Sequence, residues 1–335
     1  MSELRFVDVC AGAGGMALGL EQAGFDPVLL LDRNPVACDT LRRNRPTWQV
    51  LETDLLDFSP SRHQEVYDID LLSAGLPRVR SSATVARTET EAELRLLEAT
   101  TYLVHAVQPR ALVIENVPEL VSAPDFEPIR ELMRKELVHL GYRSRWFLLN
   151  AADFGVPQNR KQGLLVALKE QHFDAFLPPE PTVLEHLSVG RALRRSMAMS
   201  GWQDADRWAA QALGVAPTLV GGSDKRGGAD LGPTGTKRAW ARMGVDGGTV
   251  ADDVPGPDFT WAPQAGRHGM VKITTDQAAL LQGFPSDWGF AGKKTARYRQ
   301  IGHASPPPVA KALGLAIRTA LGSPTPPAAG YTSTP

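Results

Sequence analysis

The stretch that most constrains the fold is LRFVDVCAGAGGMALGL, where a β-type run passes through glycines into a helical pattern. Residues 4–9 favour a strand, and the AGAGG turn at 11–15 lets the backbone bend sharply and approach a ligand beside the positive end of a helix. The next apolar run, PVLLLD (27–32), predicts a second buried strand, and residues 35–44 predict a second helix. This order of elements is typical of an α/β domain with a parallel sheet.

The same alternation continues along the first half of the chain. Apolar runs at 69–72, 111–114 and 164–168 predict three more buried strands, with helical stretches between them, notably at 91–107. We therefore expect an α/β fold with a mostly parallel, doubly wound sheet. A length of 335 residues with 43% hydrophobic content is enough for one large core and a smaller lobe.

The composition and the apolar pattern of the sequence change at about residue 185. From there to residue 272 glycine is dense and apolar runs are short, so we predict a separate, irregular lobe over 185–272. The main domain then consists of residues 1–184 plus 273–321, and the Pro-, Ser- and Thr-rich residues 322–335 predict a disordered tail. Basic residues cluster in the lobe at Lys225, Arg226, Lys237 and Arg238.

Composition and terminal signals exclude several classes of protein. No segment approaches the roughly 18 consecutive apolar residues of a membrane helix, and the N-terminal MSELRFVDV lacks the regions of a secretory signal. The two cysteines and seven histidines show neither a disulfide framework nor metal-ligand spacing. We therefore expect a cytoplasmic protein without membrane or metal. The net charge of −1 excludes a uniformly basic nucleic-acid binder but leaves room for a local basic face.

Acidic residues follow the second and third predicted strands. Asp32 ends the strand at 27–32, about 20 positions after the glycine turn, where a carboxylate can hold ribose hydroxyls. Asp54 occupies the corresponding place after the next probable strand. The layout predicts a nucleoside cofactor, and spacing alone leaves both NAD and S-adenosylmethionine open.

Six stretches together resemble the motifs of one known family, the DNA cytosine-5 methyltransferases. Each match alone is weak, but they run in family order over most of the chain and leave only the variable lobe unmatched. The stretches are FVDVCAGAGGMALGLEQAGF, LLLDRNPVACDTLRRNRP, IENVP (the Glu-Asn-Val motif), FGVPQNRKQ (the Gln-x-Arg-x-Arg motif), AALLQGFPSDW and RQIGHASPPPVAKALG.

This resemblance implies the fold, the cofactor and the residues that bind it. The fold would be a Rossmann-like S-adenosylmethionine-dependent methyltransferase domain with a small irregular target-recognition domain, and its last helix would pack beside the first strand. Phe6 would lie near the sulfonium, and His303 stands where the family has Asn near the methionine end. The implied S-adenosyl-L-methionine contacts are Phe6, Asp8, Ala11, Gly12, Gly14, Gly15, Asp32 (ribose), Asp54 and Leu55 (adenine), His303 and Ala304.

The same matching places the catalytic residues. The family adds a cysteine thiolate to C6 of an everted cytosine so that C5 becomes nucleophilic. Its Pro-Cys pair is here Pro77-Arg78, and Arg78 stays charged with no lone pair for attack. Glu115 matches the carboxylate that hydrogen-bonds N3 and the amino group of the base. Arg160 matches the first arginine of the Gln-x-Arg-x-Arg motif, but the second, which helps hold the base oxygen, is Gln162.

The resemblance further implies double-stranded DNA in the cleft between the main domain and the lobe. The lobe's basic, glycine-rich loops would read the major groove, where base edges are distinguishable, and contact with phosphate alone is equally open for each basic residue. We expect a monomer, and the family admits a cognate restriction or defence partner. The expected DNA-binding residues are Arg80, Arg87, Gln158, Gln162, Lys225, Arg226, Lys237 and Arg238.

Three functions remain open once the nucleophilic cysteine is missing. The chain could methylate C5 through an unrecognised nucleophile, methylate the exocyclic N4 of cytosine by direct attack, or be a catalytically inactive DNA-binding or regulatory homologue. Decay would also erode the cofactor loop, yet the AGAGG turn, Asp32 and Asp54 are intact. We therefore favour methyl transfer, and by a small margin transfer to N4.

Overall fold

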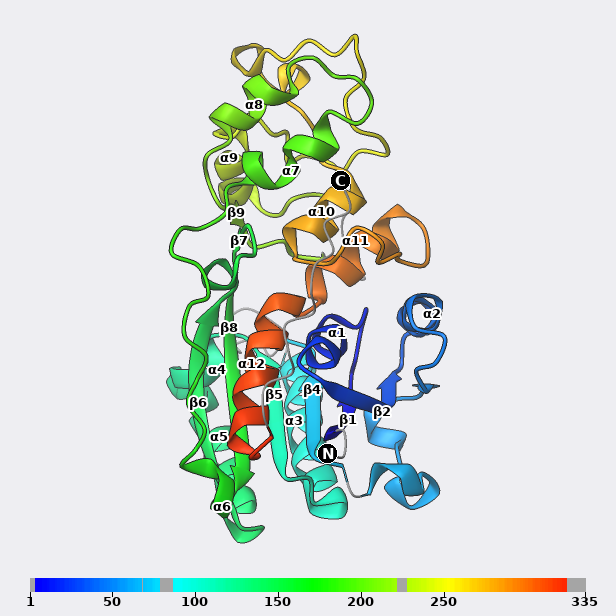
Figure 1. Ribbon diagram of the computed structural model, residues 1–335, viewed down its shortest axis with the longest axis vertical. Helices are drawn as coiled ribbons and strands as arrows, with labels where there is room; N and C mark the ends of the chain where they lie inside the picture. The colour runs from blue at the N-terminus through cyan, green and yellow to red at the C-terminus, as the bar shows by residue number, and fades with distance from the viewer. Residues whose placement is uncertain (1–3, 68, 79–86, 222–227, 324–335) are drawn as a thin grey trace.

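The computed structural model describes residues 4–67, 69–78, 87–221 and 228–323, and a seven-stranded sheet runs through the main domain (Figure 1). The strand order is β3-β2-β1-β4-β5-β8-β6. Neighbours from β3 to β5 pair in parallel, whereas β8 is antiparallel to both β5 and β6. From β1 the strands β2 and β3 are added on one side, and β4 and β5 on the other. The boundary between β1 and β4 is therefore the topological switch point of the sheet. The strands are β1 (Leu4–Val9), β2 (Phe25–Asp32), β3 (Val50–Glu52), β4 (Leu71–Gly75), β5 (Ala111–Asn116), β6 (Tyr142–Asn150) and β8 (Lys161–Lys169).

Helices cover both faces of this sheet. Alternate residues of β1 serve different cores: Phe6 packs in one apolar cluster, whereas Val7 and Val9 pack in the other. Burial on both faces explains why the inner strands are almost continuously apolar. One face carries α1 (Gly15–Gln22) and α12 (Pro307–Ala320), and the other carries α3 (Arg87–Val107) and α5 (Glu127–His139). The main domain also contains α2 (Pro35–Asn44), α4 (Glu119–Ser122) and α6 (Glu170–Phe173).

The last helix, α12, returns from the C-terminus to the start of the domain. It packs closely against α1. The two helices are so near each other that a side chain at Gly19 would overlap Ala310. The Arg318 guanidinium donates to the Gly24 carbonyl at 2.6 Å, which ties α12 to the turn after α1. The expected neighbour was the first strand itself, and the structure corrects this: α12 lies on α1, because the small residues there allow the two helices to approach.

The second lobe is largely irregular, as the glycine-rich sequence predicts. Its tryptophans Trp202, Trp208, Trp240 and Trp261 are buried and form a core that is continuous with the α1 face of the sheet. Figure 1 shows the lobe stacked above the sheet. Its elements are α7 (Val189–Met197), α8 (Ala205–Gln211), β9 (Ala216–Pro217) and α9 (Thr234–Ala241), and β9 pairs with β7 (Gln158–Asn159) of the main domain. The chain then returns to the main domain through α10 (Thr275–Leu281) and α11 (Lys294–His303).

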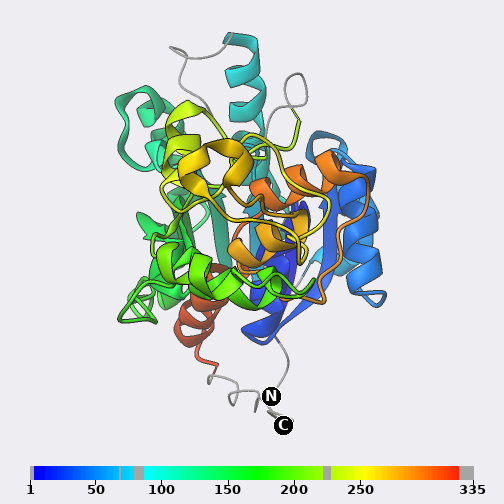
Figure 2. The ribbon, with the colours of Figure 1, turned by 90° about the horizontal axis from the view of Figure 1, so that it is seen from above.

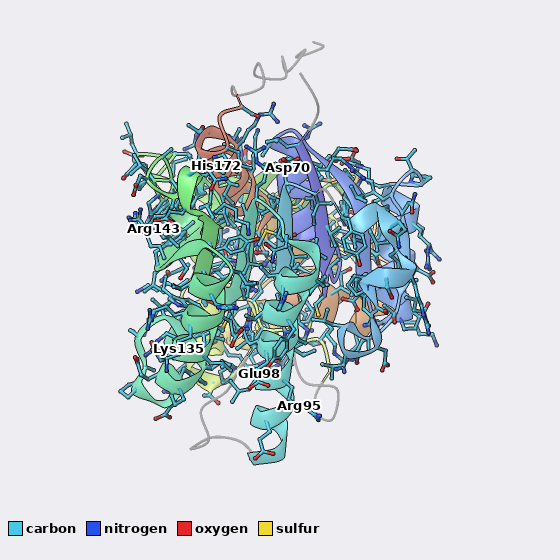
Figure 3. All side chains as sticks on the ribbon, turned by 90° about the horizontal axis from the view of Figure 1, so that it is seen from below. Asp70, Arg95, Glu98, Lys135, Arg143 and His172 are labelled. Carbon is cyan, nitrogen blue, oxygen red and sulfur yellow. The ribbon has the colours of Figure 1, made fainter. Side chains whose placement is uncertain are left out.

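The pole opposite the lobe is held together by one guanidinium. Arg110 donates to Asp70 Oδ1 at 2.9 Å and to the Leu321 carbonyl at 2.9 Å, and its Nη2 lies 3.3 Å from His172 Nε2. Figure 3, seen from this pole, shows Asp70 and His172 close together. These contacts join the starts of β4 and β5 to α6 and the end of α12, and leave the carboxyl ends of the strands for a site. Within the described chain, no helix combines the length and apolarity needed to cross a membrane.

Candidate active site

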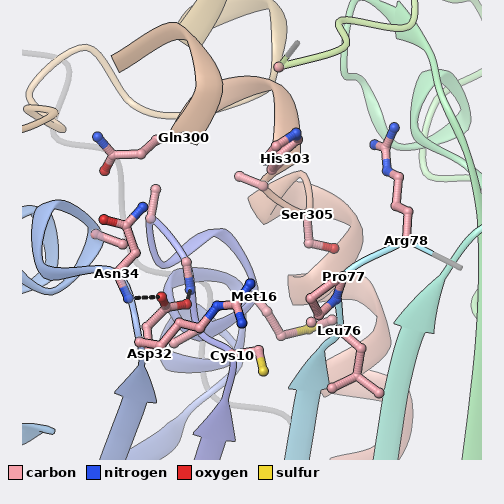
Figure 4. Close-up of a pocket in the computed structure, with 18 of the residues that line it drawn as sticks. Cys10, Met16, Asp32, Asn34, Leu76, Pro77, Arg78, Gln300, His303 and Ser305 are labelled. Carbon is pink, nitrogen blue, oxygen red and sulfur yellow. Dashed lines mark hydrogen bonds between the residues drawn. The ribbon is translucent and has the colours of Figure 1, made fainter. Parts of the chain in front are cut away.

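The carboxyl ends of β1, β2, β4 and β5 open into a cavity of about 800 Å³ (Figure 4). It lies at the switch point of the sheet, where open α/β sheets bind their ligands. Two predicted groups of residues meet in this one space. Predicted cofactor residues on its wall are Asp8, Ala11, Gly12, Asp32, Asp54, Leu55, His303 and Ala304, and predicted catalytic residues there are Pro77, Arg78 and Glu115.

The glycine turn fixes the orientation of Asp32. The Gly12 amide donates to Asp32 Oδ2 at 2.8 Å, and the Asn34 amide donates to Oδ1 at 2.8 Å. Gly12 has φ +54°, in the left-handed region that glycine adopts at little cost. Burial is the main reason that the pKa of Asp32 is raised. Each oxygen accepts one backbone hydrogen bond and keeps a lone pair that can face a ribose hydroxyl.

The other two glycines of the turn are needed for packing. A side chain at Gly14 would come within 2.6 Å of Leu41 Cδ2, and one at Gly15 would overlap the Ser305 carbonyl. Neither residue is part of the cavity wall. Both glycines let α1 approach α2 and the segment between α11 and α12, and their contact with the cofactor stays a prediction.

Phe6 was expected near the sulfonium, but it is fully buried in the core and is not on the cavity wall. At a rise of about 3.3 Å per residue, Phe6 lies about 10 Å before Val9, the last residue of β1, whereas Cys10, which follows the strand, lines the cavity. The prediction was wrong because a strand position three residues from the carboxyl end faces other core residues rather than the ligand.

Carboxylates give the floor of the cavity a negative field. Asp8 is fully buried, and its Oδ1 accepts a hydrogen bond from Ser73 Oγ at 2.6 Å. Its Oδ2 has no hydrogen-bond partner among the described residues, and burial raises the pKa of Asp8 to about 7. Burial, together with Asp32, Asp8 and Asp54, raises the pKa of the Cys10 thiol to about 12. Such a floor suits a ligand that carries positive charge.

One end of the cavity is shaped by the loop after β3. Asp54 Oδ1 accepts from the Leu56 amide at 3.0 Å and so holds the turn that places Leu55 against the cavity. Asp54 Oδ2 lies 3.4 Å from Arg33 Nη1, and Arg33 is largely exposed. Val36 and Ala37 add apolar surface nearby, which is the chemistry that a planar base requires.

At the other end Arg78 and Glu115 line the cavity, and a second guanidinium, that of Arg160, is buried behind the wall. Glu115 ends β5 with 7% exposure, and Arg78 follows β4. Behind them Arg160 is buried and donates through Nη1 to the carbonyls of Leu219 and Gly302, at 3.1 and 3.0 Å. Its Nε and Nη2 find no hydrogen-bond partner in the described parts of the chain. Burial and the charge of Arg78 lower the pKa of Arg160 to about 9, so this end favours a ligand with hydrogen-bond acceptors.

Comparison with known proteins identifies the family. A family model described as C-5 cytosine-specific DNA methylase matches residues 4–211 and 231–319. The chain belongs to this family. It is 44% identical to the Type II methyltransferase M.NaeI of Lentzea aerocolonigenes, over 96% of this chain and 76% of that protein. It is 41% identical to the Type II methyltransferase M.NgoMIV of Neisseria gonorrhoeae, over 94% of this chain and 97% of that protein.

Solved structures of similar fold support the same conclusion about the architecture. A putative DNA modification methyltransferase from an Escherichia coli prophage superposes with a TM-score of 0.66 at 19% identity, covering 96% of this chain and all of that one. The Dnmt2 methyltransferase of S. pombe gives 0.62 at 16% identity, covering 96% and 99%. The predicted Rossmann-like fold is thus confirmed, and S-adenosyl-L-methionine is the methyl donor of the family.

Two of the predicted DNA contacts of this methylase lie inside the protein. Gln158 donates to Gln282 Oε1 at 2.7 Å and accepts from the Leu219 amide at 2.8 Å, and Gln162 donates to Ser305 Oγ at 2.7 Å. Both amides are buried. We correct their assignment: they join the lobe and the C-terminal segment to the sheet, and no surface that DNA could touch includes them.

The remaining predicted DNA contacts of the methylase are distributed unevenly. Arg80, Lys225 and Arg226 lie outside the described residues, as does the side chain of Arg87. Lys237 forms an ion pair with Asp230 at 3.1 Å, whereas Arg238 is exposed on α9. Figure 2 shows α3, drawn in cyan, projecting past the lobe at one side of the molecule. These positions stay predictions of contact with DNA.

Proposed function

We propose that the chain is an S-adenosyl-L-methionine-dependent DNA cytosine methyltransferase that acts on an everted cytosine in duplex DNA and methylates its exocyclic N4. One observation carries the proposal: a single cavity joins Asp32 and the glycine turn to Glu115, and Arg78 stands where the family places its nucleophile. A donor and an everted base can therefore meet in one space.

The wall of the cavity fits the donor in charge and shape. Asp32, held by two backbone amides, would bind the ribose hydroxyls, and Asp54 with Leu55 would hold the adenine. Asp8, with an unpartnered oxygen among the described residues, would face the positive sulfur. His303 and Ala304 would line the methionine end. When bound, S-adenosyl-L-methionine supplies a methyl group on a cationic sulfur and is left as a neutral thioether.

No thiolate is available for the covalent route to C5. The pKa of Cys10 is raised to about 12, so it is a thiol at neutral pH. Cys38 is buried, donates to the Asp32 carbonyl at 3.4 Å and has its pKa raised to about 11. Arg78 cannot attack C6 because it has no usable lone pair.

Transfer to N4 needs only groups that the site contains. Glu115 accepts a hydrogen bond from the amino group and takes up the proton that N4 releases as the nitrogen–methyl bond forms and the sulfur–methyl bond breaks. Arg160 is buried behind the cavity wall with Nε and Nη2 unpartnered in the described chain, and these donors would serve the base oxygen where the base reaches past the wall. Arg78 adds positive charge at the same end. Positioning of the amino nitrogen in line with the methyl group supplies the rest.

The lobe and the relatives support the DNA part of this function. We propose that residues 185–272 form the target-recognition domain and that duplex DNA binds between it and the main domain 1–184 plus 273–321. The relatives are named Type II methyltransferases, so we infer a restriction-modification role with a cognate nuclease. We propose a cytoplasmic protein that works as a monomer on DNA.

The test is product analysis. The purified chain is incubated with labelled S-adenosyl-L-methionine and unmethylated genomic duplex DNA, and the DNA is digested to nucleosides and compared with methylated standards by mass spectrometry. We expect N4-methyl-2′-deoxycytidine, and no product from the Glu115→Gln variant. 5-Methyl-2′-deoxycytidine would refute the N4 acceptor. Absence of every methylated nucleoside, with donor binding intact by calorimetry, would instead make the chain a DNA-binding or regulatory homologue.

A further inference from the structure

Gln162, which stands in place of the second arginine of its motif, is tied to a serine on the cavity wall. We propose that Ser305 donates a hydrogen bond to the carboxylate at the methionine end of the donor, and that Gln162 is the positioning residue that orients the Ser305 hydroxyl. The inference rests on the proposed binding of S-adenosyl-L-methionine in this cavity. It gives Gln162 a role toward the donor in place of the role toward DNA that the sequence suggested.

The hydrogen bond between the two side chains determines where the serine proton can go. Gln162 Nε2 donates to Ser305 Oγ at 2.7 Å, and both residues are buried. A hydroxyl has one proton and two lone pairs, so this bond uses a lone pair and leaves the proton to be donated elsewhere. Within the described chain no acceptor is recorded for it, and Ser305 lines the cavity. The proton is therefore available to a ligand.

The position of Ser305 identifies which part of the donor it meets. A side chain at Gly15 would overlap the Ser305 carbonyl, so Ser305 lies on the first turn of α1. The first amides of a helix lack intrahelical acceptors and favour an anion. The floor instead carries the carboxyl groups of Asp8 and Asp32, whose ionised forms a sulfonium would stabilise. The anionic group of the donor, its carboxylate, is thus expected on the cavity side of the first turn of α1, beside Met16 and Ser305.

The neighbours of Ser305 agree with this placement. Figure 4 shows Ser305 and His303 next to each other along the wall, and Ala304 between them also lines the cavity. Met16, in the first turn of α1, contributes to the same wall. The pair of Gln162 and Ser305 thus adds a neutral donor beside the imidazole of His303. A neutral amide at position 162 favours this role, because its N–H occupies a serine lone pair and leaves the proton free.

Two ligands that differ only at the amino-acid end provide the test. S-Adenosylhomocysteine carries the carboxylate, whereas 5′-methylthioadenosine has the same adenosine thioether without it. By calorimetry on the full chain, Ser305→Ala is expected to weaken S-adenosylhomocysteine about tenfold or more, the effect of one hydrogen bond to a charged group. Binding of 5′-methylthioadenosine should stay within about twofold, since it lacks that group.

The positioning role of Gln162 has its own signature. In Gln162→Glu the carboxylate accepts the serine proton, so the hydroxyl can no longer donate to the ligand, and the same selective loss is expected as for Ser305→Ala. If burial of that charge prevents folding, Gln162→Leu replaces it, with a smaller selective loss of about threefold from the unoriented hydroxyl. Ser196→Ala is the matched control, because Ser196 Oγ also accepts from a glutamine, Gln277, at 3.0 Å, but away from the cavity.

The outcomes separate this inference from the proposed function. If the wild-type chain binds S-adenosylhomocysteine and Ser305→Ala binds it equally well, the inference is overturned while the proposed function stands. Equal loss of both ligands would also overturn it, because damage to the whole site would explain the result. If the wild-type chain binds neither ligand, the proposed function itself fails. Selective loss in both variants, with the control unchanged, would establish the pair.

Discussion

Asp8 offers the sharpest test of the electrostatics of the cavity. It is fully buried at the end of β1, with one oxygen bonded to Ser73 and the other unpartnered among the described residues. Replacement by asparagine keeps the shape and the acceptor for Ser73 but removes the charge. The folded and unfolded states should then no longer differ in how they bind a proton at this position.

The size of the effect follows from the pKa of Asp8. It rises from 3.8 to about 7 on folding, a difference of about three pKa units, or about 4 kcal/mol at about 1.36 kcal/mol per unit. A carboxyl whose folded pKa is raised contributes stability that is full below about pH 4 and is lost progressively as the pH rises to about 7. Asp8→Asn escapes this loss, but its new amide N–H groups lack acceptors, which costs about 1–2 kcal/mol.

The two terms predict a pH-dependent difference between the proteins. At pH 8 we expect Asp8→Asn to be more stable than wild type by about 2–3 kcal/mol, and at pH 5 the two proteins should be nearly equal. Guanidinium unfolding of the ligand-free chain, followed by tryptophan fluorescence at both pH values, measures this difference. A difference that is the same at both pH values, or a variant that is the less stable one at pH 8, would refute the raised pKa.

Donor binding gives the same argument a second readout. A cationic sulfonium favours ionised Asp8, so the affinity of wild type for S-adenosylmethionine should rise by about tenfold as the pH passes through about 7. S-Adenosylhomocysteine is neutral at sulfur and should show a much smaller change. Asp8→Asn should lose the difference between the two ligands, and calorimetry at pH 6 and pH 8 would show this.

Three further predictions follow from the packing and the loop after β4. Arg78→Cys returns a thiol to the nucleophile position, and mass spectrometry of treated DNA should detect 5-methyl-2′-deoxycytidine; its absence would mean that the base does not lie over this residue. Gly19→Val forces a side chain into Ala310 and should lower the free energy of unfolding by about 1–3 kcal/mol in denaturation experiments. Trp288→Ala removes a buried indole whose Nε1 donates to the Ala13 carbonyl at 3.2 Å, so stability should fall by about 3–5 kcal/mol. Because that bond holds the glycine turn, donor affinity measured by calorimetry should fall as well.

The sequence predicted the parallel strands well because burial on both faces leaves a simple pattern. PVLLLD and ALVI are uninterrupted apolar runs, and they correspond to β2 and β5. The edge strand β6 was missed, because Arg143 and Arg145 interrupt its apolar residues and one of its sides is half exposed. An edge strand carries the charges that a central strand excludes, so it reads as a loop or a helix end.

The candidate site was predictable where a short segment carries its own geometry. The turn at 11–15 and Asp32 meet as expected because consecutive strands of a parallel sheet end at the same edge. Roles that depend on distant contacts were not predictable. In the sequence Gln162 is only a departure from a DNA-contact motif. Its hydrogen bond to Ser305, 143 positions away, shows that it faces the C-terminal segment. Phe6 reads as a ligand contact until its depth in the core is known.

Arg78, which departs from the family pattern, lies next to Arg160, which keeps it, and the energetics of this pair argue for a bound ligand. Arg160 is buried beside Arg78, with two nitrogens unpartnered in the described chain. A buried polar group without a partner costs about 1–3 kcal/mol, and a neighbouring like charge adds to that cost. A site that had lost its substrate would gain stability from an apolar side chain at this position. An arginine at this position is expected to be retained where a base rich in hydrogen-bond acceptors binds and pairs with the unpartnered nitrogens. We therefore propose that the site still binds the base and that the methyl group goes to a different atom of it.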